Sequence, residues 1–187
     1  MSTLDNPNAP VNPSSIGPTI LRYGLIGALV FIVYALIGNL TGMTSPGAGF
    51  GMMALNLLIS LVLFVGVIVI AVRNFRDSEN NGFISFKNAF LIGLGVVVII
   101  GILNGLFTYL YATVIEPDYL ETVLGETERM YERFNMSEDQ IEELMAQMRD
   151  TMTPGRLLIQ SLIGSVIMGA IVSAIVGAIM KRNPENA

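Results

Sequence analysis

The chain has 187 residues, of which 52% are hydrophobic and 13% are charged, whereas soluble domains carry about 25% charged residues. This composition excludes an ordinary soluble domain and leaves room for one helical membrane domain, without a separate soluble enzyme domain. The absence of cysteine and histidine excludes disulfides, thiol catalysis, zinc sites of the Cys/His type and histidine-ligated haem, and we predict no cofactor.

The placement of charge indicates where the chain lies. All 25 charged residues fall outside three stretches of 50, 28 and 24 residues, namely 23–72, 88–115 and 157–180. A helix needs about 20 apolar residues to cross a bilayer, and a charge at mid-membrane costs about 2.5 to 3.5 kcal/mol. We therefore predict an all-α integral membrane protein whose first partner is the lipid bilayer, and nucleic acid is not among its predicted partners.

The first two predicted spans share one uncharged stretch. Residues 1–19 are rich in Pro, Asn and Ser and lack an apolar run, which predicts a disordered N-terminal tail. The 50-residue stretch that follows is too long for one helix, and Pro and four glycines at 41–51 mark a loop within it. We expect spans at about 20–40 and 52–72.

The third and fourth spans begin at recognisable helix caps. Ser85 follows an Asn-Asn-Gly turn and is the predicted cap of a span at about 86–112. A span at about 156–180 follows Thr153 as cap and Pro154 at the first helical position. Four spans give one membrane domain over residues 20–182.

A charged insertion, residues 113–156, separates the last two spans and holds 11 of the 15 acids against four arginines, a net charge of −7. Apolar residues recur at helical spacing on both sides of Asn135, and Ser137 with Gln140 forms a capping box. We predict an extramembrane hairpin of two amphipathic helices. Its apolar stripes either pack on each other or offer a methionine-rich face to a partner helix.

The fourth span carries a ridge of small residues at every fourth position, and Gly101 and Gly105 offer a matching groove in the third span. Such ridges let helices approach closely, either inside one chain or as the seam of a homo-oligomer, and we favour packing inside the chain. The ridge consists of Ser161, Ser165, Gly169, Ser173 and Gly177.

Four amides form a candidate polar cluster in the halves of the spans nearer to the insertion: Asn39, Asn56, Asn104 and Gln160. Hydrogen bonding between helices is the more frequent use of such residues. The alternative is a shallow polar vestibule beneath the acidic insertion.

Basic residues near span ends predict the orientation, because they are enriched on the cytoplasmic side. If the N-terminus is cytoplasmic, only Arg149 and Arg156 lie near span ends on the outer side. We therefore predict that both termini lie in the cytoplasm, where the near basic residues are Arg22, Arg73, Arg76, Lys87, Lys181 and Arg182.

The segment NGFISFKNAF at 81–90, together with RYGL at 22–25, resembles the bacterial membrane family catalogued as domain of unknown function 4199. The resemblance covers about residues 20–182. It implies a protein of the bacterial cytoplasmic membrane that has four spans and a long charged insertion before the last. It implies no activity, because that family is uncharacterised.

Three classes of function are weighed against these features. A non-enzymatic protein that assembles with itself or with a membrane-protein partner, through the ridge and the insertion, is favoured. The alternative is a small transporter or channel component for an apolar or lipid-like solute, since no span holds an acid or histidine at mid-membrane for ion coupling. An enzyme is disfavoured, because no span offers an acid, base, thiol or metal ligand to activate a nucleophile.

Overall fold

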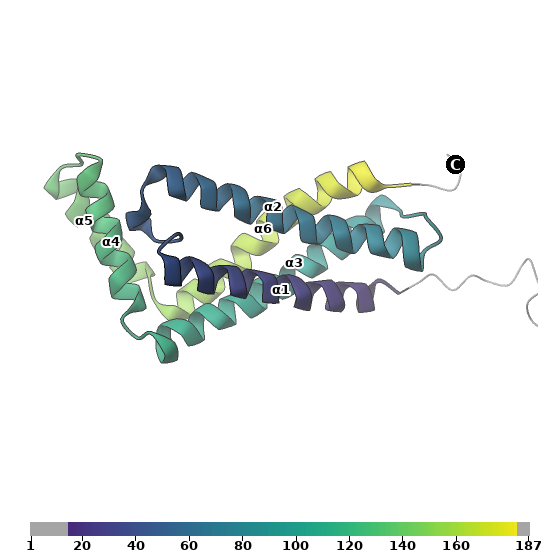
Figure 1. Ribbon diagram of the computed structural model, residues 1–187, viewed down its shortest axis with the longest axis horizontal. Helices are drawn as coiled ribbons and strands as arrows, with labels where there is room; N and C mark the ends of the chain where they lie inside the picture. Colours follow the sequence, from purple (N-terminus) through teal and green to yellow (C-terminus); the bar gives the residue numbers. More distant parts are fainter. Residues whose placement is uncertain (1–14, 183–187) are drawn as a thin grey trace, which may run out of the picture.

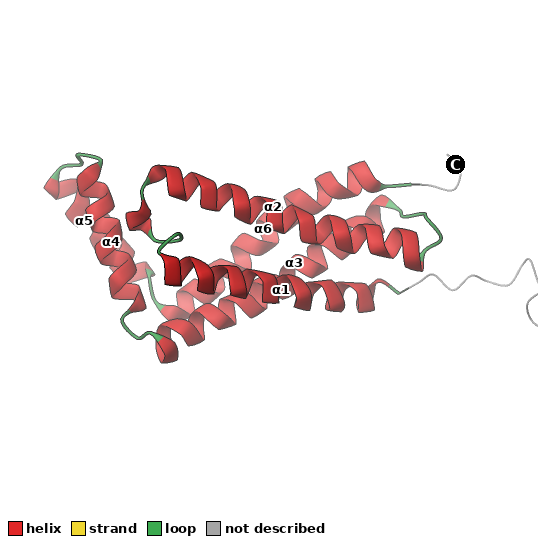
Figure 2. Ribbon diagram, in the orientation of Figure 1, coloured by secondary structure: helices red, strands yellow, loops and turns green. Residues whose placement is uncertain are grey.

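The computed structural model describes residues 15–182, and most of them are helical. Figure 1 shows the path of the chain through these helices, and Figure 2 shows the short loops that join them. In chain order the elements are α1 (Ile16–Thr41), η2 (Pro46–Ala48), α2 (Phe50–Asn74), η3 (Phe75–Glu79), α3 (Phe86–Leu110), η4 (Tyr111–Ile115), α4 (Tyr119–Arg133), α5 (Glu138–Thr151) and α6 (Pro154–Met180).

Four helices are long and apolar enough to cross a membrane: α1, α2 with its continuation η3, α3 with its continuation η4, and α6. Over residues 15–182, the prediction of an all-α protein with four helices able to span a membrane is confirmed. By contrast, α4 and α5 have 15 and 14 residues, fewer than the roughly 20 that a span requires. In Figure 1 these two helices lie together at one end of the four long ones.

The first helix begins earlier than predicted. Residues 1–19 were expected to form a disordered tail, but α1 begins at Ile16, so the prediction is wrong for the last four of them. Pro18 is compatible with this start, because it lies in the first turn, whose N–H groups have no partner inside a helix. The rest of the predicted tail, residues 1–14, lies outside the described residues.

The insertion is shorter than the predicted range 113–156. The third span continues through the wider turns of η4 to Ile115, and α6 begins at Pro154. Residues 113–115 are uncharged, so an apolar helix can extend through them. The segment that joins the last two spans is therefore 116–153.

The predicted helix caps are confirmed. The Ser85 hydroxyl accepts a hydrogen bond from the N–H of Asn88 at 3.2 Å. Ser137 and Gln140 form the full capping box at the start of α5. The Thr153 hydroxyl accepts a hydrogen bond from the N–H of Arg156 at 3.4 Å. It thereby satisfies one of the backbone N–H groups at the start of α6 that have no partner inside the helix.

The central helix is α3, which makes its most extensive contacts with α6 and α1 and also touches α2. The buried apolar core lies toward one end of the bundle, at the right of Figure 1, and we call this the core end. It holds the first turns of α1, the turn between α2 and α3, and the last turns of α6. The largest fully buried apolar side chains of this core are Ile68, Val72, Phe75, Ile84, Ile92, Val96 and Val97.

Polar contacts close the core end. The buried Thr19 hydroxyl donates to the Glu79 carboxylate at 2.8 Å, which ties the start of α1 to the end of η3. Ile84 and Arg182 exchange two backbone hydrogen bonds of 3.0 and 2.9 Å, which tie the α2–α3 turn to the chain that leaves α6. The described ends of the chain therefore lie at the same end of the bundle.

The opposite end, which we call the α4–α5 end, is more open. Phe50 and Leu57 near the start of α2 are 75% and 73% exposed, whereas Ile68 further along the same helix is fully buried. The connection between α1 and α2 contacts α4 through η2. The cavities described below lie at or near this end.

Candidate functional site

The apolar stripes of α4 and α5 pack on each other. Leu124 of α4 and Ile141 and Met145 of α5 are buried together. The surrounding side chains that pack against them are Tyr131, Met136, Met148 and Met152. Most of the methionines in this region are therefore used inside the α4–α5 pair, and they do not form an open apolar face for a partner helix.

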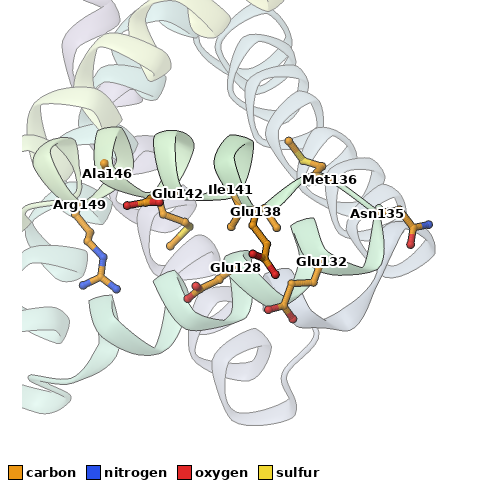
Figure 3. Close-up of a pocket in the computed structure, with 10 residues that line it drawn as sticks. Glu128, Glu132, Asn135, Met136, Glu138, Ile141, Glu142, Ala146 and Arg149 are labelled. Atoms are coloured by element: carbon orange, nitrogen blue, oxygen red, sulfur yellow. The ribbon is translucent and has the colours of Figure 1, made fainter.

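An acidic groove of about 910 Å³ lies on this pair of helices. Figure 3 shows Glu128 and Glu132 of α4 and Glu138 and Glu142 of α5 around it. The apolar atoms that line it come from Met136, Ile141, Met145 and Ala146, and Arg149 is the one basic residue among the described residues of its lining. Arg149 also pairs with Glu121 at 3.7 Å. The groove is thus negatively charged, with an apolar floor.

The four amides of the predicted polar cluster have separate surroundings. The Asn56 side chain accepts a hydrogen bond from the Tyr34 hydroxyl, which links α2 to α1. The Asn104 amide donates to the carbonyl of Ile100 at 3.1 Å and to that of Ala28 in α1 at 3.5 Å. Both residues therefore bond between helices, as the more frequent use of such amides implies.

The other two amides differ from this pair. Gln160 is exposed on α6. Asn39, at the end of α1, accepts from the Thr44 hydroxyl at 3.1 Å and lines a cavity beneath α4. One amide of the four thus contributes to a polar vestibule, and the set as a whole does not converge on one site.

The ridge of small residues on α6 packs against α3. A Cβ atom added at Gly101 of α3 would lie 2.7 Å from the Cβ of Ser165, and one added at Gly105 would lie 3.3 Å from the Oγ of Ser161. The Ser161 hydroxyl also donates to the Gly101 carbonyl at 3.3 Å. Further along the ridge, a Cβ atom added at Gly169 would lie 2.7 Å from the Cγ1 of Val97. Because α3 already occupies the ridge, it is not an open seam for a second copy.

Two adjoining cavities of about 150 and 110 Å³ lie where α1, α3 and α4 meet the α1–α2 connection, and both are lined by Asn39, Thr44 and Tyr119. We call them together the junction cavity. Its further lining residues that carry polar or aromatic side chains are Ser45, Phe107, Thr108, Tyr111, Glu116, Thr122 and Glu126.

Aromatic rings and carboxylates shape the junction cavity. The rings of Tyr111 and Tyr119 are nearly perpendicular, at 85°, with centroids 5.2 Å apart. The Tyr111 hydroxyl donates to Glu116 at 2.8 Å, and the Ser45 hydroxyl donates to Glu126 at 2.5 Å. Burial raises the pKa of the Tyr119 phenol, and the two carboxylates raise it further, which indicates a negative potential at this ring.

Of the residues that line the junction cavity, only Asn39 was predicted from the sequence as a site residue. The aromatic residues of the cavity lie on both sides of the Glu116-Pro117 break, where the chain leaves the third span and turns into α4. The available signal was a group of aromatic residues, Phe107, Tyr109, Tyr111 and Tyr119, around the end of an apolar run. Tyrosine is common at such positions for a different reason, because its amphipathic ring suits the membrane surface.

Comparison with known proteins identifies the family. Residues 22–182 match the profile of a family described as a protein of unknown function, DUF4199. The chain belongs to this family. The match includes all four spans of this DUF4199 protein except the first residues of α1, and it also includes α4 and α5. No curated protein and no solved structure matches the chain.

Proposed function

We propose that this DUF4199 protein is a non-enzymatic component of the bacterial cytoplasmic membrane that binds a basic segment of a partner protein in its acidic groove. The groove is the observation that supports this function. Carboxylates from both helices surround apolar atoms of Ile141 and Met145, and Arg149 offsets only one of the four negative charges. A segment with basic and apolar side chains matches both features.

The partner is a different protein and not a second copy of the chain. The ridge on α6 packs against α3, which disfavours assembly of two copies through the ridge. Residues 113–156 carry a net charge of −7, and two such segments brought face to face would repel each other.

The proposed orientation places both termini in the cytoplasm and the groove on the outer side of the membrane. The core end carries basic residues near all four spans, which favours the cytoplasm for that end. They are Arg22, Arg73, Arg76, Lys87, Lys181 and Arg182. A reporter fused after Asn135 tests the orientation, and activity of a reporter that works only in the cytoplasm would contradict it.

Site-specific photo-crosslinking in native membranes tests partner binding. A photoreactive residue at Ala146, which lines the groove, is expected to give a crosslinked adduct. The same residue at Gln147, which is exposed but lies outside the groove lining, is the matched control. Equal adducts at the two positions, or none at Ala146, would contradict a partner in the groove.

Charge variants test whether the partner is recognised by its basic residues. Glu128, Glu132, Glu138 and Glu142 are changed together to glutamine, and the Ala146 adduct is expected to disappear. The control removes the same charge from exposed acids outside the groove lining: Asp118→Asn, Asp139→Asn, Glu143→Gln and Asp150→Asn. An adduct that survives the first set, or that both sets abolish alike, would contradict recognition by the groove.

Binding of an apolar or lipid-like solute is the second candidate function, and one observation favours it. A groove of about 250 Å³ opens between α2 and α6, lined by Phe31, Leu57, Ser60, Leu61, Phe64, Gly164, Ser165 and Met168. A Cβ atom added at Gly164 would meet no atom within 4 Å, so we expect the side chain of Gly164→Leu to extend into this groove. Gly66→Leu, also in open space but outside the groove lining, is its control. If the groove carries a solute, only Gly164→Leu should reduce flux through reconstituted liposomes.

A further inference from the structure

The junction cavity holds two carboxylates without a cationic partner. Glu116 and Glu126 accept hydrogen bonds from hydroxyl groups of Tyr111 and Ser45, and within residues 15–182 neither takes part in a salt bridge. The basic residue that reaches this region is Arg133, and its guanidinium donates instead to the Gly47 carbonyl at 2.8 Å. No lysine or arginine of the described chain lines the cavity.

The aromatic walls add to this negative potential. The ring centroids of Phe107 and Tyr111 are 5.8 Å apart, and the ring of Tyr111 is nearly perpendicular to that of Tyr119. Three aromatic rings therefore follow one another at one side of the cavity. The face of an aromatic ring is its negative side and attracts cations, most strongly where water is displaced. Carboxylates beside ring faces form the kind of site that recognises an organic ammonium group.

We propose that the junction cavity binds a small organic cation, with an alkylated ammonium group held beside the contacting rings of Tyr111 and Tyr119 and near the carboxylates of Glu116 and Glu126. A small ligand is expected because the two parts of the cavity, about 150 and 110 Å³, are smaller than the roughly 300 to 1,000 Å³ of drug-sized pockets. An inorganic ion is disfavoured, because no three acidic side chains of the described residues come together to hold a metal.

The site is independent of the acidic groove, because the two share no lining residue. The same ammonium chemistry occurs in free amines and in lipid headgroups, and the cavity lies where the third span ends. A partner protein in the groove is not required for binding here, so failure of either proposal leaves the other open to its own test.

Binding of choline to the purified full-length protein in detergent tests the proposal. Choline is compared with 3,3-dimethylbutan-1-ol, a neutral molecule of the same shape, and radiolabelled choline is measured by equilibrium dialysis. Choline is expected to bind, and an excess of the neutral molecule is expected not to displace it. Absence of choline binding, or equal competition by the neutral molecule, would overturn the proposal.

Variants assign the binding to this cavity. Tyr119→Leu is expected to weaken choline binding by about 2- to 30-fold, the range of one cation–π contact, whereas Tyr119→Phe keeps the ring and should retain binding. Glu126→Gln removes the negative charge but keeps an oxygen that can accept the hydrogen bond from Ser45, and it should also weaken choline binding. Tyr109→Leu and Glu138→Gln remove a ring and a charge outside the cavity and are the controls. Equal affinities of Tyr119→Leu, Glu126→Gln and both controls would overturn the assignment.

Nanodiscs of defined composition distinguish the two sources of the ammonium group. If the ligand is a lipid headgroup, phosphatidylcholine nanodiscs should suppress binding of added choline relative to phosphatidylglycerol nanodiscs. If the ligand is a free solute, choline should bind equally in both. If Tyr119→Leu leaves choline binding unchanged in both kinds of nanodisc, the ammonium group does not bind in the junction cavity, whichever its source.

Discussion

Two phenylalanines at the ends of one helical segment show how differently the two ends of the bundle are built. Phe75, where α2 continues into η3, is fully buried at the core end, whereas Phe50 at the start of α2 is 75% exposed. Both belong to a candidate span of high hydropathy. The core end therefore holds the bundle together, and the α4–α5 end leaves room for cavities and a groove.

The largest expected effect comes from truncating the buried member of this pair. Phe75→Ala should lower the free energy of unfolding by about 3 to 5 kcal/mol, because it leaves a cavity in a close-packed core. Phe50→Ala removes the same atoms where they face the surroundings and should change it by less than about 0.5 kcal/mol. Unfolding in detergent followed by circular dichroism measures both. Similar losses for the two variants would contradict a core confined to one end.

The contact between α3 and α6 gives the next largest effect. Gly101→Ala places a methyl group 2.7 Å from the Cβ of Ser165 and should cost about 1 to 3 kcal/mol through overpacking. Adding Ser165→Gly removes the atoms that clash, so the double variant should regain part of this loss. Gly66→Ala, which meets open space, is the control and should not destabilise the protein. Equal unfolding midpoints for Gly101→Ala and Gly66→Ala would argue against close approach of α3 and α6.

These close contacts were predictable from the sequence, because small residues at every fourth position align on one face of a helix whatever surrounds them. The spans and caps were predictable for similar local reasons. The helix ends at Ile16 and Ile115 were missed because uncharged residues beside a span are compatible with either helix or loop. Hydropathy also could not separate the two halves of α2, since both are apolar.

The candidate site was harder to predict, because its residues meet through the rotation of separate helices. The position of an amide along a span indicates how deep it lies, but not which neighbour it faces. Asn56 thus bonds to Tyr34, whereas Gln160 is exposed. The junction cavity additionally depends on the reversal of the chain after Glu116, which brings Tyr119 against Tyr111.

Hydrogen bonding between spans should have a smaller effect than packing. Tyr34→Phe removes the bond to Asn56 that joins α1 to α2, and we expect a loss of about 0.6 kcal/mol, the average for such bonds inside membranes. Tyr109→Phe removes an exposed hydroxyl of α3 as the control. Chemical unfolding of the two variants side by side measures the difference. A loss above about 2 kcal/mol for Tyr34→Phe would mean that polar contacts, and not packing, hold α2 in place.

The smallest expected effect concerns Ser173, a fully buried serine of the ridge. Its hydroxyl is fully buried and has no hydrogen-bond partner among the described residues. Removing a buried polar group that lacks a partner is nearly neutral or stabilising, so Ser173→Ala should leave the unfolding midpoint unchanged or raise it. Ser165→Ala is the control, because the Ser165 hydroxyl donates to the Leu162 carbonyl at 2.9 Å and lies outside the core. If Ser173→Ala destabilises the protein by more than Ser165→Ala does, the hydroxyl has a partner in the membrane, and the core end is held by polar contacts as well as by packing. If it does not, serine serves there as a small residue, and its size alone allows α6 to approach Gly93 of α3.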